Sequence, residues 1–327
     1  MNARPLIPMA AVTTVAALSM AALGGCTNHT SGRTEDGKLK VVASFYPMEF
    51  LAERIGGNHI ELSTLTKPGV EPHDLEISPR QTARLSEAGL VVYLKGLQPA
   101  VDEAIGQAEP KQVADAADFT RFEEHGTEVH GDEGHSGEEG EGGAHEGHDH
   151  SHDAGSDPHV WLDPVRYAQV ARGVGKALEK ADPDHAGAYR KNTAALVKEL
   201  DALNTEFREG LADRATSTFI TTHSAFGYLA ERYGLTQEAI SGVDPESEPS
   251  PARMRELHDA AERDKVDTVF FETLASDRTA KTLAGDLHLK TDVLDPIEGI
   301  GDKSKGDDYL AVQRANLKAL QRALGGK

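Results

Sequence analysis

The sequence predicts an α/β protein of two lobes, each with a parallel sheet flanked by helices, joined by one long rigid helix. Short apolar runs rich in β-branched residues alternate with amphipathic segments over residues 39–94, and the same alternation returns over residues 217–296. Such alternation indicates parallel sheets connected by right-handed crossovers. Between these regions, residues 183–212 carry apolar side chains at three- and four-residue steps, which predicts a continuous helix linking the lobes.

The first lobe is predicted over residues 39–182. Its strands are short apolar runs, in the order LKVVASF, IELSTLT and LVVYL. Between them, YPMEFLAERIGG predicts a helix that stops at paired glycines, and SPRQTARLSEAG predicts a second helix. In this second helix, Ser78 fits the N-cap and Pro79 fits the first helical position. A further helix, VRYAQVARGVGKALEKA, leads toward the linking helix.

The second lobe is predicted over residues 213–327 and repeats the alternation. Its predicted strands are STFITT, QEAISGV, VDTVFFE and KTDVLDP. Its predicted helices are SAFGYLAERYG, SPARMRELHDAAERD, SDRTAKTLAGDL and DYLAVQRANLKALQRAL. The second of these helices has Ser250 at its N-cap and Pro251 at its start, and the last is amphipathic and closes the chain.

The N-terminus has the layout of a bacterial secretory signal. Arg4 precedes a mainly apolar stretch from Leu6 to Leu23, and the sequence LGGC follows. We therefore expect residues 1–25 to be a signal peptide and Cys26 to carry a lipid, with residues 26–38 as a tether. The alternatives are a buried structural cysteine and a transmembrane anchor made from the same apolar run. Lipidation would hold the protein to the cell membrane on its extracytoplasmic face.

Charge and cysteine content exclude several classes of function. A net charge of −20 argues against a protein that binds nucleic acid or an anionic membrane surface, because either would need a basic surface to neutralise phosphates. The single cysteine leaves no disulfide framework, no CxxC redox pair and no thiolate zinc cage. Attachment to the membrane is therefore expected through the lipid on Cys26.

An insert at residues 123–157 breaks the α/β pattern. Residues 122–155 contain eleven Asp and Glu and no Lys or Arg, and glycine is frequent among them. With so little apolar surface to bury, the insert is predicted to be disordered. We expect weak auxiliary zinc binding by its histidines, the alternative being a solubilising spacer. These histidines are His125, His130, His135, His145, His148, His150 and His152.

Four polar residues stand where ligands collect in open parallel sheets, which is at the carboxyl ends of the strands. His73 follows IELSTLT, His159 lies between Pro158 and the apolar VW, His223 directly follows STFITT, and Asp295 directly follows TDVL. Three imidazoles and one carboxylate suit tetrahedral Zn²⁺, with two ligands from each half of the chain and the ion in the cleft between the lobes. Manganese favours sites richer in oxygen.

Two acids lie close to these residues in sequence. Glu71 and Glu272 could each accept a ring N–H and fix the tautomer of a ligating histidine. The alternative is that both are ordinary surface carboxylates.

Five stretches carry a resemblance to a known family. GVEPHDLEISP, DPHVWLDP, THSAFGYLAERYGL, FFETLASDRTAKTLA and VLDPIEG resemble the landmark stretches of the metal-binding lipoproteins that serve ABC importers, in particular the zinc-uptake branch. The likeness runs from about residue 39 to the C-terminus, interrupted by the histidine-rich insert. It implies metal ligands at His73, His159 and His223, and an acid at Asp295 that some members replace with water.

The resemblance also implies a function. We expect a monomeric solute-binding protein, not an enzyme, that captures Zn²⁺ outside the membrane and delivers it to an ABC permease. Delivery of Mn²⁺ by the same fold is the first alternative. A secreted zinc hydrolase is the second, although the sequence has no HExxH motif.

Overall fold

The computed structural model describes residues 32–125, 156–245 and 247–326. These described residues belong to one compact unit. Within the described residues, no helix is both long enough and apolar enough to cross a bilayer. The predicted signal peptide, the lipid on Cys26 and six insert histidines lie outside the described residues, the histidines being His130, His135, His145, His148, His150 and His152.

The first sheet has four parallel strands in the order β2-β1-β3-β4. These are β1 (Leu39–Ala43), β2 (Ile60–Thr64), β3 (Leu90–Tyr93) and β4 (Val113–Asp115). The helices of this lobe are α1 (Tyr46–Gly56), α2 (Pro79–Glu87) and α3 (Pro99–Ala108). Helix α2 begins at Pro79 because Ser78 and Gln81 form a capping box, which satisfies backbone N–H groups that a helix start leaves unpaired.

The second sheet repeats this arrangement, with four parallel strands in the order β6-β5-β7-β8. They are β5 (Thr218–Thr221), β6 (Thr236–Ala239), β7 (Thr268–Phe271) and β8 (Lys290–Val293). The helices are α6 (Gly227–Tyr233), α7 (Pro251–Asp264), α8 (Arg278–Asp286) and α9 (Tyr309–Ala323). The predicted architecture of two parallel sheets flanked by helices is therefore confirmed.

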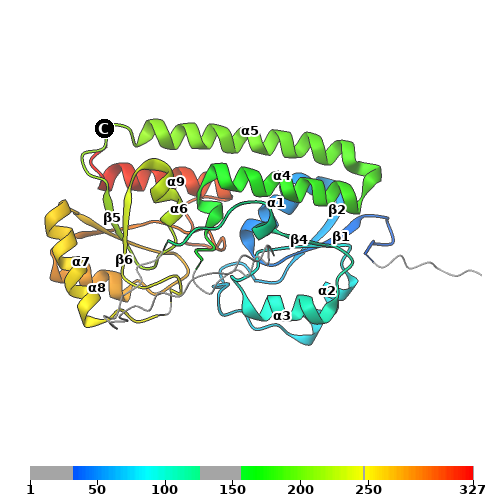
Figure 1. The fold of residues 1–327 in the computed structure, drawn as a ribbon, viewed down its shortest axis with the longest axis horizontal. Helices are drawn as coiled ribbons and strands as arrows, with labels where there is room; N and C mark the ends of the chain where they lie inside the picture. Colours follow the sequence, from blue (N-terminus) through cyan, green and yellow to red (C-terminus); the bar gives the residue numbers. More distant parts are fainter. Residues whose placement is uncertain (1–31, 126–155, 246, 327) are drawn as a thin grey trace, which may run out of the picture. The chain divides into compact units, whose positions relative to one another are not determined.

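Helices α4 (Pro164–Ala181) and α5 (Ala186–Gly210) connect the two sheets. Helix α5 has 25 residues, which corresponds to about 37 Å of helix. It packs against α1 and α4 of the first lobe and against α9 of the second. Figure 1 shows α5 running alongside α4 and α9. Because one helix contacts both lobes along its length, it makes the connection between them stiff.

The largest apolar core is shared by both lobes. Trp161 is fully buried and packs edge-on against Phe45, with ring centroids 5.1 Å apart. Its Nε1 donates a hydrogen bond of 2.7 Å to the carbonyl oxygen of Pro296, which follows β8. Tyr309 of α9 donates from its hydroxyl to the carbonyl oxygen of Trp161 at 2.5 Å. These contacts fix the loop after β8 against the residues that follow the insert.

Candidate metal centre

Three histidines and one glutamate converge on one point. The Nε2 atoms of His73, His159 and His223 lie 3.3, 3.1 and 3.4 Å from Oε1 of Glu298. His73 comes from the loop after β2, His159 precedes a short 3₁₀ turn at Val160–Leu162, and His223 follows β5. The structure thus brings together three residues that the sequence places far apart.

The spacing of these atoms matches a tetrahedral ion site. Zinc lies about 2.0–2.1 Å from histidine nitrogen and carboxylate oxygen, so neighbouring ligand atoms in a tetrahedron are about 3.3 Å apart. The group is also buried, with side-chain exposures of 0% for His159 and His223, 1% for Glu298 and 12% for His73. Among the described residues, Nε2 of His223 has no well-aligned hydrogen-bond partner, since Glu298 Oε1 lies 3.4 Å away. A buried nitrogen without a partner is costly unless it has a ligand.

Asp157 orients His159. Its Oδ1 accepts a hydrogen bond from the His159 backbone amide at 2.9 Å and lies 2.7 Å from the ring Nδ1. A proton held on Nδ1 makes Nε2 the nitrogen that donates to Glu298 in the metal-free protein and that offers its lone pair to an ion once that second proton has left. The sequence reasoning did not single out Asp157, although it stands two residues before the histidine in DPH.

Glu272 holds His223 in the same way. Its Oε1 lies 2.6 Å from Nδ1 of His223 and also accepts the hydroxyl of Thr222. The backbone carbonyl of His223 accepts a 2.8 Å hydrogen bond from Thr221 Oγ1, which fixes the chain as it leaves β5. The ring therefore has a defined orientation before any ion arrives, and a proton kept on Nδ1 leaves Nε2 as the atom that an ion would take.

Glu71 acts on the loop of His73. Both of its carboxylate oxygens accept the backbone amide of His73, at 3.2 and 3.0 Å. The carbonyl oxygen of Pro72 accepts a 3.1 Å hydrogen bond from Gln98, which ties the loop to the start of α3. Burial, reinforced by the charge of Glu298, raises the pKa of Glu71 to about 7.

Asp295 does not join the metal-ligand group. Its Oδ1 accepts the backbone amide of Ile297 at 2.8 Å, and its Oδ2 accepts the hydroxyl of Thr273 at 2.9 Å. Ile297 has a φ of 60°, which is strained for a β-branched residue. The Asp295 carboxylate therefore holds the bend that turns Glu298 toward the histidines, and the acid in the cluster is Glu298.

Carboxylates control the charge of the imidazoles. Burial disfavours charge on His159, but the Asp157 and Glu298 carboxylates outweigh it and raise the pKa of this imidazole. Burial also opposes charge on His223, and Glu272 with Glu298 raises its pKa well above the usual range. Despite its own burial, hydrogen bonds to the histidines hold the pKa of Glu298 well below the ordinary value. A cation that binds here must displace protons.

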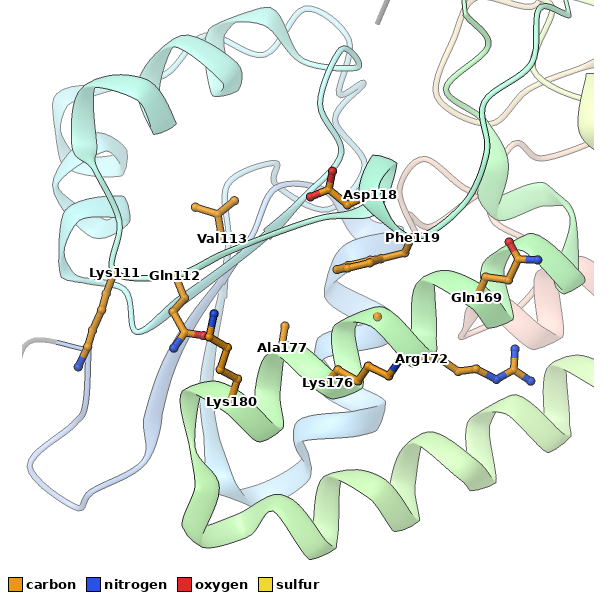
Figure 2. Close-up of a pocket in the computed structure, with 11 residues that line it drawn as sticks. Lys111, Gln112, Val113, Asp118, Phe119, Gln169, Arg172, Lys176, Ala177 and Lys180 are labelled. Atoms are coloured by element: carbon orange, nitrogen blue, oxygen red, sulfur yellow. The ribbon is translucent and has the colours of Figure 1, made fainter. Parts of the chain in front are cut away.

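Two cavities differ in their suitability for a cation. One of about 170 Å³ reaches Glu298 and is lined in part by Glu49 and Thr66, so it brings two carboxylates to the edge of the candidate site. The other, of about 700 Å³, lies between β4 and α4 (Figure 2) and is lined by four cationic side chains and a single carboxylate, Asp118. The cations are Lys111, Arg172, Lys176 and Lys180. The larger cavity is electrostatically unsuited to a metal ion.

The chain resembles known zinc-uptake proteins along nearly all its length. Residues 41–323 match the family model ZnuA, described as zinc-uptake complex component A, periplasmic. The zinc-binding lipoprotein AdcA of Streptococcus pneumoniae is 35% identical over 321 residues, covering 94% of this chain and 60% of the relative. The high-affinity zinc uptake system protein ZnuA of Bacillus subtilis is 35% identical over 313 residues, covering 94% of each chain.

Solved structures show the same fold. The crystal structure of Zn(II)-bound AdcA from Streptococcus pneumoniae superposes with a TM-score of 0.70 at 31% identity, covering 89% of this chain and 59% of the other. The Zn(II)-bound ZnuA-like domain of the same protein superposes with a TM-score of 0.69 at 31% identity. This match covers 88% of this chain and 99% of that domain. The chain spans about 60% of the length of the AdcA relative. The resemblance drawn from five sequence stretches is confirmed, and the chain belongs to the ZnuA family.

Proposed function

We propose that this protein captures Zn²⁺ outside the plasma membrane and delivers it to an ABC-type permease for uptake. The observation that carries the proposal is the convergence of three imidazoles and the Glu298 carboxylate at tetrahedral spacing in a buried site. The zinc-binding names of the relatives support the same ion. Attachment through a lipid on Cys26 and action as a monomer are parts of the same proposal.

Four protein ligands favour holding an ion over catalysis. A catalytic zinc keeps one coordination position for water, whereas Glu298 would occupy that position here. The family is described as an uptake component, which agrees with transport. Release to the permease then requires a movement that separates the ligands, since His159 and His223 are fully buried.

Zinc is expected to outcompete manganese. Three imidazoles and one carboxylate suit Zn²⁺ better than Mn²⁺, and the Irving–Williams order points the same way. Titration of the metal-free protein with both ions should give a Kd for Zn²⁺ at least about 100-fold lower than that for Mn²⁺. Displacement of bound Zn²⁺ by an equal concentration of Mn²⁺ would assign the protein to manganese delivery.

Zinc affinity is expected to fall as the pH is lowered, beginning above the ordinary histidine value of about 6.5. The reason is that the pKa values of His159 and His223 are raised, so protons compete for these nitrogens at higher pH than they do for free histidine. At pH values below the pKa values of both His159 and His223, log Kd for zinc should rise by about two for each unit that the pH falls, because zinc then displaces one proton from each ring. Chelator competition between pH 5.5 and 8 measures this slope, and a flat profile would contradict it.

A further inference from the structure

We propose a second zinc site at Glu123, His125 and Glu231, beside the main centre but separate from it. Glu123 and His125 lie at the start of the insert, among the last described residues before residue 126, and Glu231 lies on α6. One ligand atom from each residue can be chosen so that all three lie within 4.8 Å of one another. The sequence reasoning treated His125 as one of seven equivalent insert histidines, whereas the structure gives it fixed neighbours.

The geometry suits an ion that exchanges with solvent. Nε2 of His125 lies 3.4 Å from Oε2 of Glu231 and 3.9 Å from Oε2 of Glu123. The side chains of His125, Glu123 and Glu231 are 19%, 35% and 54% exposed. Three protein ligands leave a position for water, so binding here is weaker and faster to reverse than at four buried ligands.

A buried carboxylate prepares His125 for metal binding. Oδ2 of Asp157, whose side chain is fully buried, lies 3.2 Å from Nδ1 of His125. Neither atom has a well-aligned hydrogen-bond partner among the described residues, so each has unused bonding capacity. A proton on Nδ1 that faces Asp157 leaves Nε2 bare toward the two glutamates, the arrangement found in carboxylate–histidine–zinc sites.

The side chain of His125 is tightly packed against helix α6. Its ring packs edge-on against Tyr228, with centroids 4.4 Å apart. A Cβ added to Gly227 would lie 2.2 Å from the Cβ of His125 and 2.9 Å from Asp157, so glycine is needed at this position for the close approach. His125 is therefore held by packing as well as by charge.

Arg166 shares the two glutamates and weakens the site without closing it. Its Nη2 pairs with Oε1 of Glu123 and lies 3.7 Å from Oε2 of Glu231, and the guanidinium stacks over Tyr228 at 4.7 Å. Oε2 of Glu123 remains directed at His125. An ion must compete with this cation, which lowers its affinity below that of the main centre. A purely structural ion-pair network is the alternative that the experiment must separate.

One carboxylate links the two centres. Asp157 faces His159 of the main centre with Oδ1 and His125 with Oδ2. The Asp157 carboxylate therefore lies between a ligand of the second site, His125, and a candidate ligand of the main centre, His159. The existence of this site does not rest on the proposed function.

The test counts zinc ions in the full chain. The six insert histidines outside the described residues are first replaced by asparagine, which removes competing imidazoles; they are His130, His135, His145, His148, His150 and His152. Equilibrium dialysis against Zn²⁺ with elemental analysis should give two ions in this background. His125→Ala and the milder Glu231→Gln should each leave one ion, and the control His258→Ala, exposed on α7, should leave two.

The outcomes separate the second site from the main one. A background that binds one ion, or a His125→Ala variant that keeps two, overturns the second site. Loss of thermal stability in the metal-free His125→Ala and Glu231→Gln variants, with the count still at two, assigns these residues to the structural network and also overturns it. Failure of His223→Ala to remove any ion from the background would instead overturn the proposed function.

Discussion

Replacement of His159 by alanine is expected to weaken zinc binding by at least about 100-fold. Structural zinc sites with four ligands have binding free energies of about 10–16 kcal/mol, or about 3 kcal/mol for each ligand, and about 1.4 kcal/mol corresponds to a factor of ten. His159 is fully buried and lies 3.1 Å from Glu298, so its ring supplies a ligand atom from inside the site. Competition with a chelator of known affinity measures the change in Kd.

The same substitution should destabilise the metal-free protein. Without the imidazole, the fully buried Asp157 and the nearly fully buried Glu298 lose a shared partner. Breaking a buried charged pair by removing one member costs about 3–5 kcal/mol. Denaturant unfolding of the metal-free variant measures this loss, and it keeps the effect on folding separate from the effect on zinc affinity.

His185→Ala is the matched control for His159→Ala. Nδ1 of His185 lies 2.7 Å from Oδ2 of Asp182, the same distance as between His159 and Asp157, but the pair is remote from the metal ligands in the sequence and shares none of their contacts. Its removal should leave the Kd for zinc unchanged within about threefold. This margin is close to the deviation from additivity that substitutions at distant, independent sites show. Equal losses in both variants would show that zinc affinity follows general stability and not ligation.

The fold could be predicted because its signals are local. The β-branched runs that form β1, β5 and β7 predict buried strands, and the Ser-Pro pairs at α2 and α7 mark the starts of two helices. Helix α3 and strand β4 were not predicted. Strand β4 has only three residues, and the sequence of α3, PAVDEAIGQA, consists largely of small side chains with a weak apolar stripe.

The metal-ligand group was harder to predict than the fold. Sequence position at strand ends selected His73, His159 and His223, and the structure brings these three together. It did not select Glu298, because the direction of that side chain depends on the left-handed backbone of Ile297. The sequence DPIEG did contain a usable signal, since an acid enclosed by proline and glycine indicates a tight turn that can redirect a side chain.

The insert was predicted as one disordered unit from its composition. Composition is an average, and it does not distinguish the ends of a segment from its middle. Glu123, His125 and Asp157 fall inside the predicted range of 123–157, yet they make defined contacts with α4 and α6. Those contacts come from residues more than forty positions away in the sequence, which local patterns do not reveal.

Glu298→Gln is expected to weaken zinc binding by about 100-fold, whereas Asp295→Asn should change the Kd by less than about tenfold. Glutamine keeps the shape of Glu298 but removes the negative charge that the cluster directs at a cation, and a neutral amide is a poor zinc ligand. Asparagine at 295 can still accept from the Ile297 amide, so the bend and the zinc ligands persist. A larger loss of zinc affinity in Asp295→Asn would restore Asp295 as the fourth ligand.

The pH dependence of these two variants provides an independent criterion. The Glu298 charge helps to raise the pKa values of His159 and His223, so its removal should lower both. Proton competition then begins at lower pH, and the curve of log Kd against pH for Glu298→Gln should be displaced to lower pH relative to the unmodified protein. Asp295→Asn should follow the unmodified curve, because Asp295 contacts Ile297 and Thr273 instead of the imidazoles. A displaced curve for Asp295→Asn alone would mean that Asp295 supplies the charge that the histidines and the zinc ion share.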